Sequence, residues 1–193
     1  MLHFLAPSLW RAIPLRRRTQ ANRVVFVVDG FNLYHSLRDV ARPTCQSTRW
    51  LDLHALCDSY LYLVGNGAHT EAIHYFTALA NHRESSSPGT VLRHKDYIAA
   101  LQDTGVTVSI ANFKRKTDFR RLRDCDVRLG RKGKWRHLTW LPFDIQFTRY
   151  EEKETDVAIA VKLVEVVVTN ACDTAVVVSG DTDIIPAIKT RAI

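Results

Sequence analysis

The stretch Val176-Val-Val-Ser-Gly-Asp-Thr-Asp-Ile-Ile-Pro186 joins an apolar, β-branched run to two acidic residues that stand two positions apart. A second stretch, Val24-Val-Phe-Val-Val-Asp29-Gly-Phe-Asn32, repeats this design near the start of the chain. Continuous runs of Val and Ile are typical of strands that are buried on both faces of a parallel sheet. In open α/β sheets, functional sites lie just beyond the carboxyl ends of such strands. We therefore expect Asp29, Asp181 and Asp183 to gather along one edge of a sheet.

Elsewhere the chain alternates apolar runs of strand length with helical patterns. Strands are predicted over 24–28, 72–79, 106–113 and 175–179, and helices over 33–40, 51–63, 91–102, 156–169 and 183–191. The segment 156–169 is rich in valine, so a strand is a rival there, but its length and the helical spacing of its apolar residues favour a helix. Strands that alternate with helices form parallel sheets with right-handed crossovers. The predicted fold class is therefore α/β with a mostly parallel sheet.

The length and overall composition of the chain indicate a single globular domain. A chain of 193 residues can fill one α/β domain but not two large ones, and a hydrophobic content of 46% indicates a globular protein. No apolar run reaches the ~18 residues of a membrane span, so no membrane partner is expected. The four cysteines form no C-x-x-C pair and follow no secretory signal, which favours a reduced, cytoplasmic environment in which cysteines act as small apolar residues.

The start of the chain differs in composition from the rest. Residues 1–22 contain several arginines, two prolines and no acid. We predict a basic extension without regular structure over 1–22, followed by one domain over 23–193 with a basic inserted arm at 114–150. An organellar transit peptide has a similar composition and is the alternative for the extension.

The inserted arm concentrates positive charge. Between Lys114 and Arg136 there are eleven Lys or Arg and three Asp, a local excess of eight charges against +7 for the whole chain. Basic residues neutralise phosphates, and aromatic side chains stack on unpaired bases. This favours contact with single-stranded RNA over a solvated loop whose Trp residues pack on the body. The residues expected to bind RNA are Lys114, Arg115, Lys116, Arg120, Arg121, Arg131, Lys132 and Trp135.

Several acids stand at predicted strand ends or helix starts, and these are the candidate catalytic residues. Gly30 allows a sharp turn after Asp29, and Asn32 is placed to hydrogen-bond a carboxylate or a bound water. Asp156 lies in the first turn of its helix, where the positive helix end favours a carboxylate, and Thr155 can cap that helix. Each acid alone also fits a structural role as a turn or cap residue. Their combination favours a site.

Crowded carboxylates repel one another, and a divalent cation relieves the repulsion. Carboxylate oxygens suit hard cations such as Mg²⁺ or Mn²⁺. Such a cation lowers the pKa of a bound water, which can then attack phosphorus in line. The sequence contains no G-x-x-x-x-G-K-[ST] loop, no G-x-G-x-x-G motif and no arrangement that suggests a covalent nucleophile. The predicted chemistry is therefore metal-assisted hydrolysis at phosphorus.

Three segments in combination resemble the NYN domain family, the LabA-like branch of the PIN-like nuclease superfamily. They are Phe26–His35, Lys153–Ala160 and Ser179–Pro186, and Phe113–Lys116 also fits that branch. The resemblance runs from about Arg23 to the end of the chain. It implies a Rossmann-like three-layer α/β/α sandwich and a Mg²⁺- or Mn²⁺-dependent ribonuclease site.

The resemblance also assigns roles on the matching positions. It implies that Asp29, Asp156, Asp181 and Asp183 hold the metal, that Asn32 belongs to the catalytic set, and that Ser179, Thr155 and Glu154 support it. Family members often carry cysteines in the segment that corresponds to Lys116–Trp135, where this chain has only Cys125, so no zinc is predicted there. The family domain usually continues beyond the last acidic pair, so a C-terminal strand and helix are expected to be missing.

The leading hypothesis is a metal-dependent endoribonuclease acting on RNA, most simply single-stranded RNA. One alternative is a non-catalytic RNA-binding or regulatory module with the same fold. Another is a phosphatase of the haloacid-dehalogenase type, which also has an Asp after its first strand. That class needs a second Asp two residues after the first, where this chain has Phe31. The sequence does not define the oligomeric state, and a homo-oligomer is one alternative.

Overall fold

The computed structural model describes residues 10–14, 21–44, 50–83, 86–121, 126–128, 135–137 and 144–189. The chain forms two compact units, one of Met1–Phe113 and Glu152–Ile193 and the other of Lys114–Glu151. The second unit begins at the residue where the sequence predicts the basic arm to begin.

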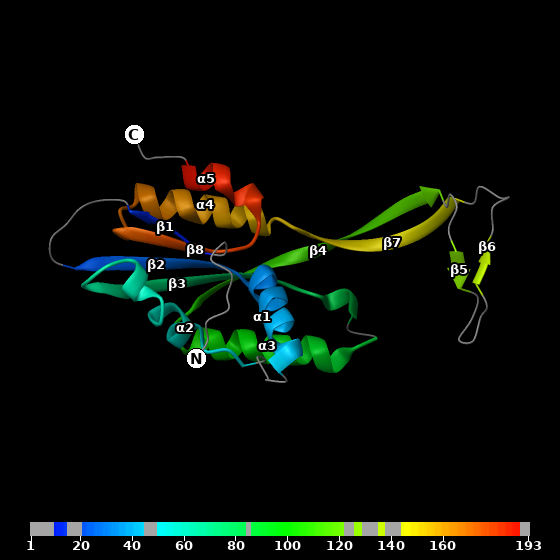
Figure 1. The fold of residues 1–193 in the computed structure, drawn as a ribbon, viewed down its shortest axis with the longest axis horizontal. Coiled ribbons are helices and arrows are strands. Elements are labelled where there is room, and N and C mark those ends of the chain that lie inside the picture. Colours follow the sequence, from blue (N-terminus) through cyan, green and yellow to red (C-terminus); the bar gives the residue numbers. More distant parts are fainter. Residues whose placement is uncertain are drawn as a thin grey trace. The chain divides into compact units, whose positions relative to one another are not determined.

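Four parallel strands form the centre of the first unit (Figure 1). In spatial order they are β8 (Thr174–Val178), β2 (Asn22–Asp29), β3 (Ala68–Leu79) and β4 (Thr107–Arg121). The strand β1 (Trp10–Pro14) pairs antiparallel with β8 at the outer edge. Strands that are neighbours in space are thus not always neighbours in sequence, as expected of a parallel sheet wound with helical crossovers.

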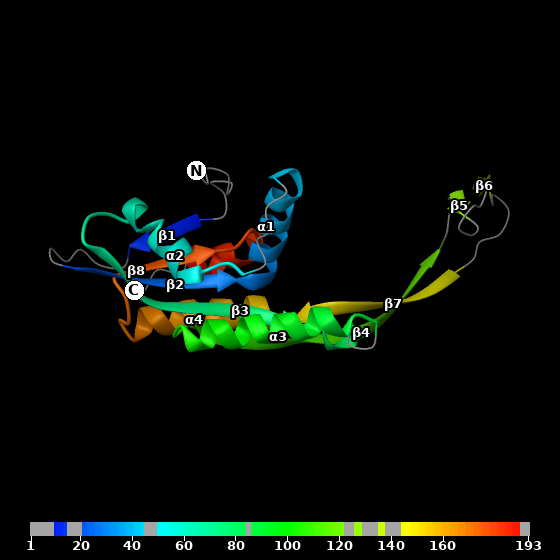
Figure 2. The ribbon, with the colours of Figure 1, turned by 90° about the horizontal axis from the view of Figure 1, so that it is seen from below.

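Helices cover both faces of this sheet (Figure 1), and Figure 2 looks onto the sheet with its strands side by side. One face carries α1 (Gly30–Thr44), α2 (Leu53–Asp58) and α3 (Pro88–Asp103), and the other carries α4 (Thr155–Val168) and α5 (Ile185–Lys189). Short 3-10 turns occur at η2 (Leu61–Leu63), η3 (Asn81–Arg83) and η4 (Thr182–Ile184). The unit is therefore a three-layer α/β/α sandwich, which confirms the predicted fold class.

The sheet is buried on both faces, which explains its continuous apolar runs. Successive residues of a strand point to opposite faces. In β2, Val24, Phe26 and Val28 belong to the core under α1 and α2, whereas Val25 and Val27 belong to the core under α4. Because both layers need apolar side chains, alternation between apolar and polar residues is absent.

The helix α4 confirms the choice of helix over strand for its valine-rich segment. Ile159, Leu163 and Val166 are buried against the sheet and stand four and three positions apart, which is a helical spacing. Of the other valines of the helix, four are exposed, namely Val157, Val161, Val164 and Val168, and Val167 is half-buried. The segment is apolar on both sides, which is why its sequence also resembles a strand.

The helix predicted over 51–63 is wrong in length, because α2 ends at Asp58 and the turn η2 follows. The Asp52 side chain accepts a hydrogen bond from the Ala55 N–H at 3.0 Å and so caps the start of α2. The Ser59 hydroxyl donates to the Leu56 carbonyl oxygen at 2.7 Å. Such local bonds compete with helix continuation, so the element is short.

The strand β1 differs from the prediction of no regular structure over 1–22. Trp10–Pro14 pairs with Thr174–Val178 along its whole length, so these residues cover an edge of β8 that would otherwise offer unpaired backbone groups. The rest of the predicted extension up to Gln20 lies outside the described residues.

The second unit is built from strands. In it β4 continues to Arg121 and lies beside β7 (Asp144–Lys153). A short antiparallel pair joins β5 (Asp126–Arg128) and β6 (Trp135–His137). The side chains of Lys114, Arg115, Lys116 and Phe119 are exposed on β4.

Two of the cysteines behave as predicted. Cys57 and Cys172 are buried and free, and burial raises the pKa of both thiols. They act as small apolar core residues. Cys45 and Cys125 lie outside the described residues. None of the helices in the described part of the chain has the length and apolar character that a membrane crossing requires.

Candidate functional site

The carboxyl ends of β2 and β8 bring the two acidic motifs together. The strands are parallel, with Val28 opposite Val178, so the next residues, Asp29 and Ser179, lie at the same edge of the sheet. The Ser179 hydroxyl donates a hydrogen bond to Asp29 Oδ2 at 2.9 Å across a sequence separation of 150 residues. The register of the sheet therefore places the ends of both acidic motifs side by side.

Asp29 is held firmly by its surroundings. It is only 2% exposed, and its carboxylate accepts four hydrogen bonds. Oδ1 accepts from the backbone N–H groups of Phe31 and Asn32 at 3.1 Å each, and Oδ2 accepts from Asn32 Nδ2 and Ser179 Oγ. The backbone donors belong to the first turn of α1, so Asp29 also caps that helix. These partners offset the cost of burying its charge.

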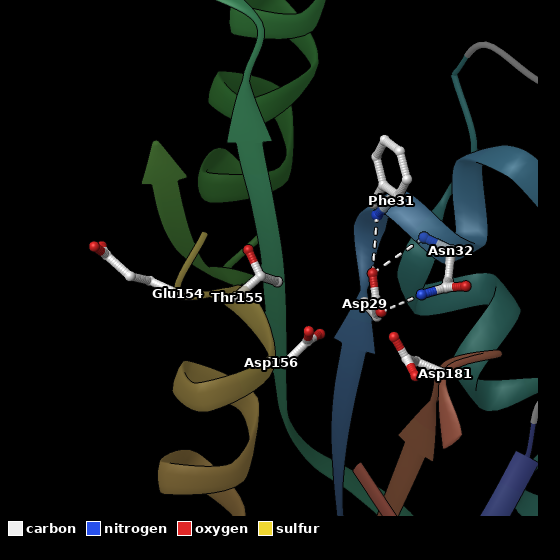
Figure 3. A pocket seen from close by; sticks show the side chains of 7 residues that line it. All are labelled: Asp29, Phe31, Asn32, Glu154, Thr155, Asp156 and Asp181. Carbon is white, nitrogen blue, oxygen red and sulfur yellow. Dashed lines mark hydrogen bonds between the residues drawn. The ribbon is translucent and has the colours of Figure 1, made fainter. Parts of the chain in front are cut away.

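A pocket of about 120 Å³ opens beside Asp29. It is lined by Asp29, Phe31, Asn32, Glu154, Thr155, Asp156 and Asp181. Figure 3 shows the carboxylates of Asp29, Asp156 and Asp181 turned toward one another, and that of Glu154 turned away. Among these lining residues none is basic, so the pocket concentrates negative charge.

The pKa of Asp156 reflects both its partial burial and the negative charge around it. It is raised above its ordinary value, mainly because partial burial disfavours the charged form. Repulsion from Asp181, Asp29 and Asp183 raises it further. The four acids therefore interact electrostatically, although they come from three separate segments of the chain.

Asp181 and Asp183 leave β8 through the turn η4. The Asp181 N–H donates to Ser179 Oγ at 3.0 Å, and Asp181 Oδ1 accepts from the Asp183 N–H at 2.9 Å. Asp181 thus caps η4 and also lines the pocket. Asp183 is exposed and does not line the pocket, so its contribution is the backbone contact to Asp181 and the repulsion that reaches Asp156.

The start of α4 differs from the prediction that Thr155 caps it. Thr155 is the first residue of the helix and is buried, whereas Glu154 occupies the cap position without a side-chain capping bond. Glu154 has φ of 80°, in the left-handed region that costs a non-glycine residue about 1–2 kcal/mol. Strain of this kind persists where the surrounding structure enforces it, and here it lies at the rim of the acidic pocket.

The donor set fits a hard divalent cation in its chemistry. The pocket offers carboxylate, amide and hydroxyl oxygens, which Mg²⁺ and Mn²⁺ prefer, and its acids repel one another. In the described part of the chain, however, no three His, Cys, Asp or Glu side chains lie close enough together to hold a metal ion.

The predicted RNA-binding residues lie in the second unit. Lys114, Arg115 and Lys116 are exposed, and Lys116 forms a 3.9 Å ion pair with Asp118. Of the other residues predicted to bind RNA, Arg120 and Arg121 lie in β4 and Trp135 lies in β6. Arg131 and Lys132 fall outside the described residues.

Sequence reasoning missed Phe31 as a member of the site. Its ring lines the acidic pocket and is 48% exposed. The sequence signal that could have indicated this role is a large apolar side chain directly after Asp29-Gly30, at the end of a strand where the neighbouring residues are polar.

The sheet and the acidic pocket at its carboxyl edge define a PIN-like α/β domain. A family model of the NYN domain matches residues 23–190, and the chain belongs to this family. The NYN domain is part of the PIN-like nuclease superfamily, whose members usually use divalent metals. The match confirms the resemblance seen in the sequence. In two further comparisons, no curated protein and no solved structure matches the chain.

Replacing Asp156 by Asn is expected to stabilise the metal-free protein. The substitution removes a charge that repels Asp29 and Asp181, and solvent screening limits the gain to about 0.5 kcal/mol in the free energy of unfolding. Thermal unfolding at pH 7 in EDTA measures the effect. Adding Mn²⁺ should raise the melting temperature of the wild type more than that of Asp156→Asn.

The pH dependence of this difference has a defined sign. Because the pKa of Asp156 is higher in the folded state, its charge lowers stability as pH rises through the two pKa values, and the cost disappears below about pH 4. The variant and the wild type should therefore converge in acid. Glu165→Gln is a control in which the change in stability should have the opposite sign. Lys162 lowers the pKa of Glu165, so removing that charge should destabilise the protein at pH 7. An Asp156→Asn variant less stable than wild type at pH 7 in EDTA would contradict the repulsion.

Proposed function

We propose that this protein is a metal-dependent endoribonuclease that hydrolyses phosphodiester bonds of single-stranded RNA. The observation that carries the proposal is the pocket at the carboxyl edge of the parallel sheet, where the carboxylates of Asp29, Asp156 and Asp181 face one another. Membership of the NYN domain family supports a nuclease. The excess of positive charge in the second unit supports a polyanionic substrate.

In this proposal, Asp29, Asp156 and Asp181 would hold Mg²⁺ or Mn²⁺. When bound, the cation would neutralise phosphate charge and lower the pKa of a bound water. Asn32 and Ser179 fix the orientation of the Asp29 carboxylate through hydrogen bonds to its Oδ2. Partners of this kind keep a ligand in position and tune its basicity.

The remaining predicted residues act through the metal-binding acids. Asp183 adds a fourth negative charge and orients Asp181 through its backbone N–H. Glu154 and Thr155 set the start of α4 and thereby the direction of Asp156. Their roles are therefore in positioning.

The RNA backbone would bind to the basic segment of the second unit. Lys114 and Arg115 are exposed, which leaves their charges accessible to phosphates. Binding through such contacts weakens steeply as salt is added, because it releases counterions from the RNA. We expect the affinity for RNA to fall in this way and to depend little on sequence.

The test uses the purified full chain and a circular single-stranded RNA, which has no ends for an exonuclease. Cleavage is expected with Mg²⁺ or Mn²⁺ and should stop in EDTA. A linear RNA labelled at one end then maps the cut positions on a gel. The Asp29→Asn variant, purified in parallel, controls for contaminating nucleases. Wild-type protein that leaves RNAs of several sequences uncut with either metal would overturn the proposal.

A specific observation favours a second candidate, a non-catalytic RNA-binding module. The carboxylate of Asp29 already accepts four hydrogen bonds, and among the described residues no three His, Cys, Asp or Glu side chains form a cluster that could hold a cation. If RNA binds in a salt-sensitive manner and stays intact with metal present, this function replaces the nuclease.

A further inference from the structure

We propose that the first turns of α1 form a base-stacking subsite for single-stranded RNA, made by Phe31, Tyr34, His35 and Arg38. The inference rests on the proposed ribonuclease function and deepens it, because it states how one nucleotide is held next to the acidic pocket. It assigns a role to a group of side chains that take no part in the proposed hydrolysis.

Two large aromatic side chains on α1 are open to solvent beside the pocket. Phe31 lines the pocket and is 48% exposed, and Tyr34, three residues later, is 58% exposed. Single exposed aromatic residues are common on proteins and need no explanation. Here two of them stand next to each other on one helix, and one borders the acidic pocket.

These aromatic side chains are held in place by one another. The ring centroids of Phe31 and His35 lie 4.5 Å apart at an interplanar angle of 66°, and those of Tyr34 and His35 lie 5.5 Å apart at 78°. Both are edge-to-face arrangements, which aromatic pairs prefer. His35 therefore braces both rings, so they are ordered before a ligand arrives while much of their surface stays open.

Arg38 adds a positive charge to the cluster. Its guanidinium carbon lies 5.8 Å from the centroid of the Tyr34 ring, and its Nη2 lies 3.2 Å from His35 Nδ1. Among the described residues no carboxylate forms an ion pair with Arg38, and the adjacent Asp39 pairs with Arg42 at 3.3 Å. The guanidinium can therefore bind a phosphate without first losing a salt bridge.

The spacing along α1 suits a strand of RNA that enters the pocket. Arg38 stands seven positions after Phe31, which corresponds to about 10 Å along a helix axis. A base stacked on Phe31 or Tyr34 would leave its flanking phosphate near Arg38, while the acids of the pocket repel phosphates that no cation screens. The cluster thus provides both groups that bind an unpaired nucleotide, an aromatic surface and a cation.

This arrangement selects unpaired RNA. The faces of bases in a duplex are covered by their neighbours, so only a single-stranded or unstacked base can lie on a protein ring. Stacking depends little on base identity, since every base has a π-face. We therefore expect a preference for single-stranded over double-stranded RNA without strong sequence preference.

The experiment measures binding apart from cleavage. The full chain carries Asp181→Asn, which keeps a side-chain acceptor at the cap of η4, and the probe is a short single-stranded RNA containing 2-aminopurine, whose fluorescence falls when it stacks. Phe31→Ala and Tyr34→Ala are each expected to weaken binding about tenfold and to reduce the quenching. Phe31→Trp should preserve both, and Phe31→Leu, which is apolar without a π-face, should not.

Two controls separate stacking from loss of structure. Tyr62→Ala removes an aromatic side chain that is 73% exposed on η2 and should leave affinity and quenching unchanged. Arg38→Gln should weaken binding and reduce its salt dependence while leaving quenching at saturating protein nearly intact. Thermal unfolding of every variant verifies that the fold is retained.

The result that overturns the inference is RNA binding and quenching by folded Phe31→Ala and Tyr34→Ala equal to those of the Asp181→Asn parent. In that case the cluster serves another class of ligand, such as a protein. This failure is distinct from failure of the proposed function. If wild-type protein never cleaves RNA but the stacking signal depends on Phe31 and Tyr34, the subsite stands without the nuclease.

Discussion

Replacing Asp29 by Asn is expected to lower the rate of RNA cleavage by at least about a thousandfold, equivalent to ~4 kcal/mol in the activation barrier. Asp29 is the one acid that the structure holds rigidly at the carboxyl end of β2, and its charge is central to the proposed cation site. Single-turnover cleavage of end-labelled RNA with saturating Mn²⁺ measures the loss.

The choice of Asn separates the chemical role of Asp29 from its structural one. Asn is as good a helix cap as Asp, so it can still accept the N–H groups of Phe31 and Asn32. The charge-assisted part of these bonds is lost, which should lower the free energy of unfolding by about 1–2 kcal/mol. The variant should therefore remain folded while it loses activity.

Asp173→Asn is the matched control. Asp173 is also a buried acid, 7% exposed, and it accepts hydrogen bonds from Arg23 N and Nε at 3.1 and 3.2 Å. It precedes β8 and so lies at the sheet edge opposite the pocket. Its replacement should cost similar stability without affecting the rate. A folded Asp29→Asn variant that cleaves at the wild-type rate, or an Asp173→Asn variant equally inactive, would contradict the assignment.

Replacing Gly30 by Ala is expected to lower the free energy of unfolding by about 3 kcal/mol. A Cβ atom at this position would overlap the Cζ and hydroxyl oxygen of Tyr75 and stand 2.8 Å from the Phe76 carbonyl oxygen. Tyr75 and Phe76 are buried in the central strand β3, so neither can move aside without disturbing the core. Denaturation by urea measures the loss.

Gly89→Ala provides the same chemical change in a permissive place. Gly89 is also in the first turn of a helix, α3, and its nearest neighbour for an added Cβ is the flexible end of Arg93 at 3.4 Å. This variant should be neutral or more stable by about 0.5 kcal/mol. If Gly30→Ala is as stable as Gly89→Ala, the close approach of Tyr75 is not a constraint on the fold.

The edge of the sheet at which the site lies could be predicted from the sequence because burial leaves a strong pattern. The runs before Asp29 and Asp181 are apolar at every position, and only a strand covered on both faces requires this. Parallel pairing then brings the ends of such strands together, so the meeting of Asp29 with Ser179 follows from the topology.

Other features depend on contacts that leave no periodic signal. The sequence indicates that Gly30 is needed for a turn, whereas the structure shows that space is limiting, because Tyr75 reaches across from β3. The left-handed backbone of Glu154 is unexpected, since nothing about a Glu marks that conformation. At the early end of α2 the Ser59 hydroxyl donates to the Leu56 carbonyl oxygen. Each of these features involves a tertiary or local contact.

The four hydrogen bonds to Asp29 have a thermodynamic consequence for any ligand of the pocket. A carboxylate has about four acceptor positions, and in this state all of them are used. Asn32 and Ser179 orient the carboxylate, but a ligand that binds Asp29 must share Oδ2 with both of them, which lowers the net gain in free energy on binding. Occupancy of the pocket should therefore respond to ligand concentration rather than saturate at trace levels.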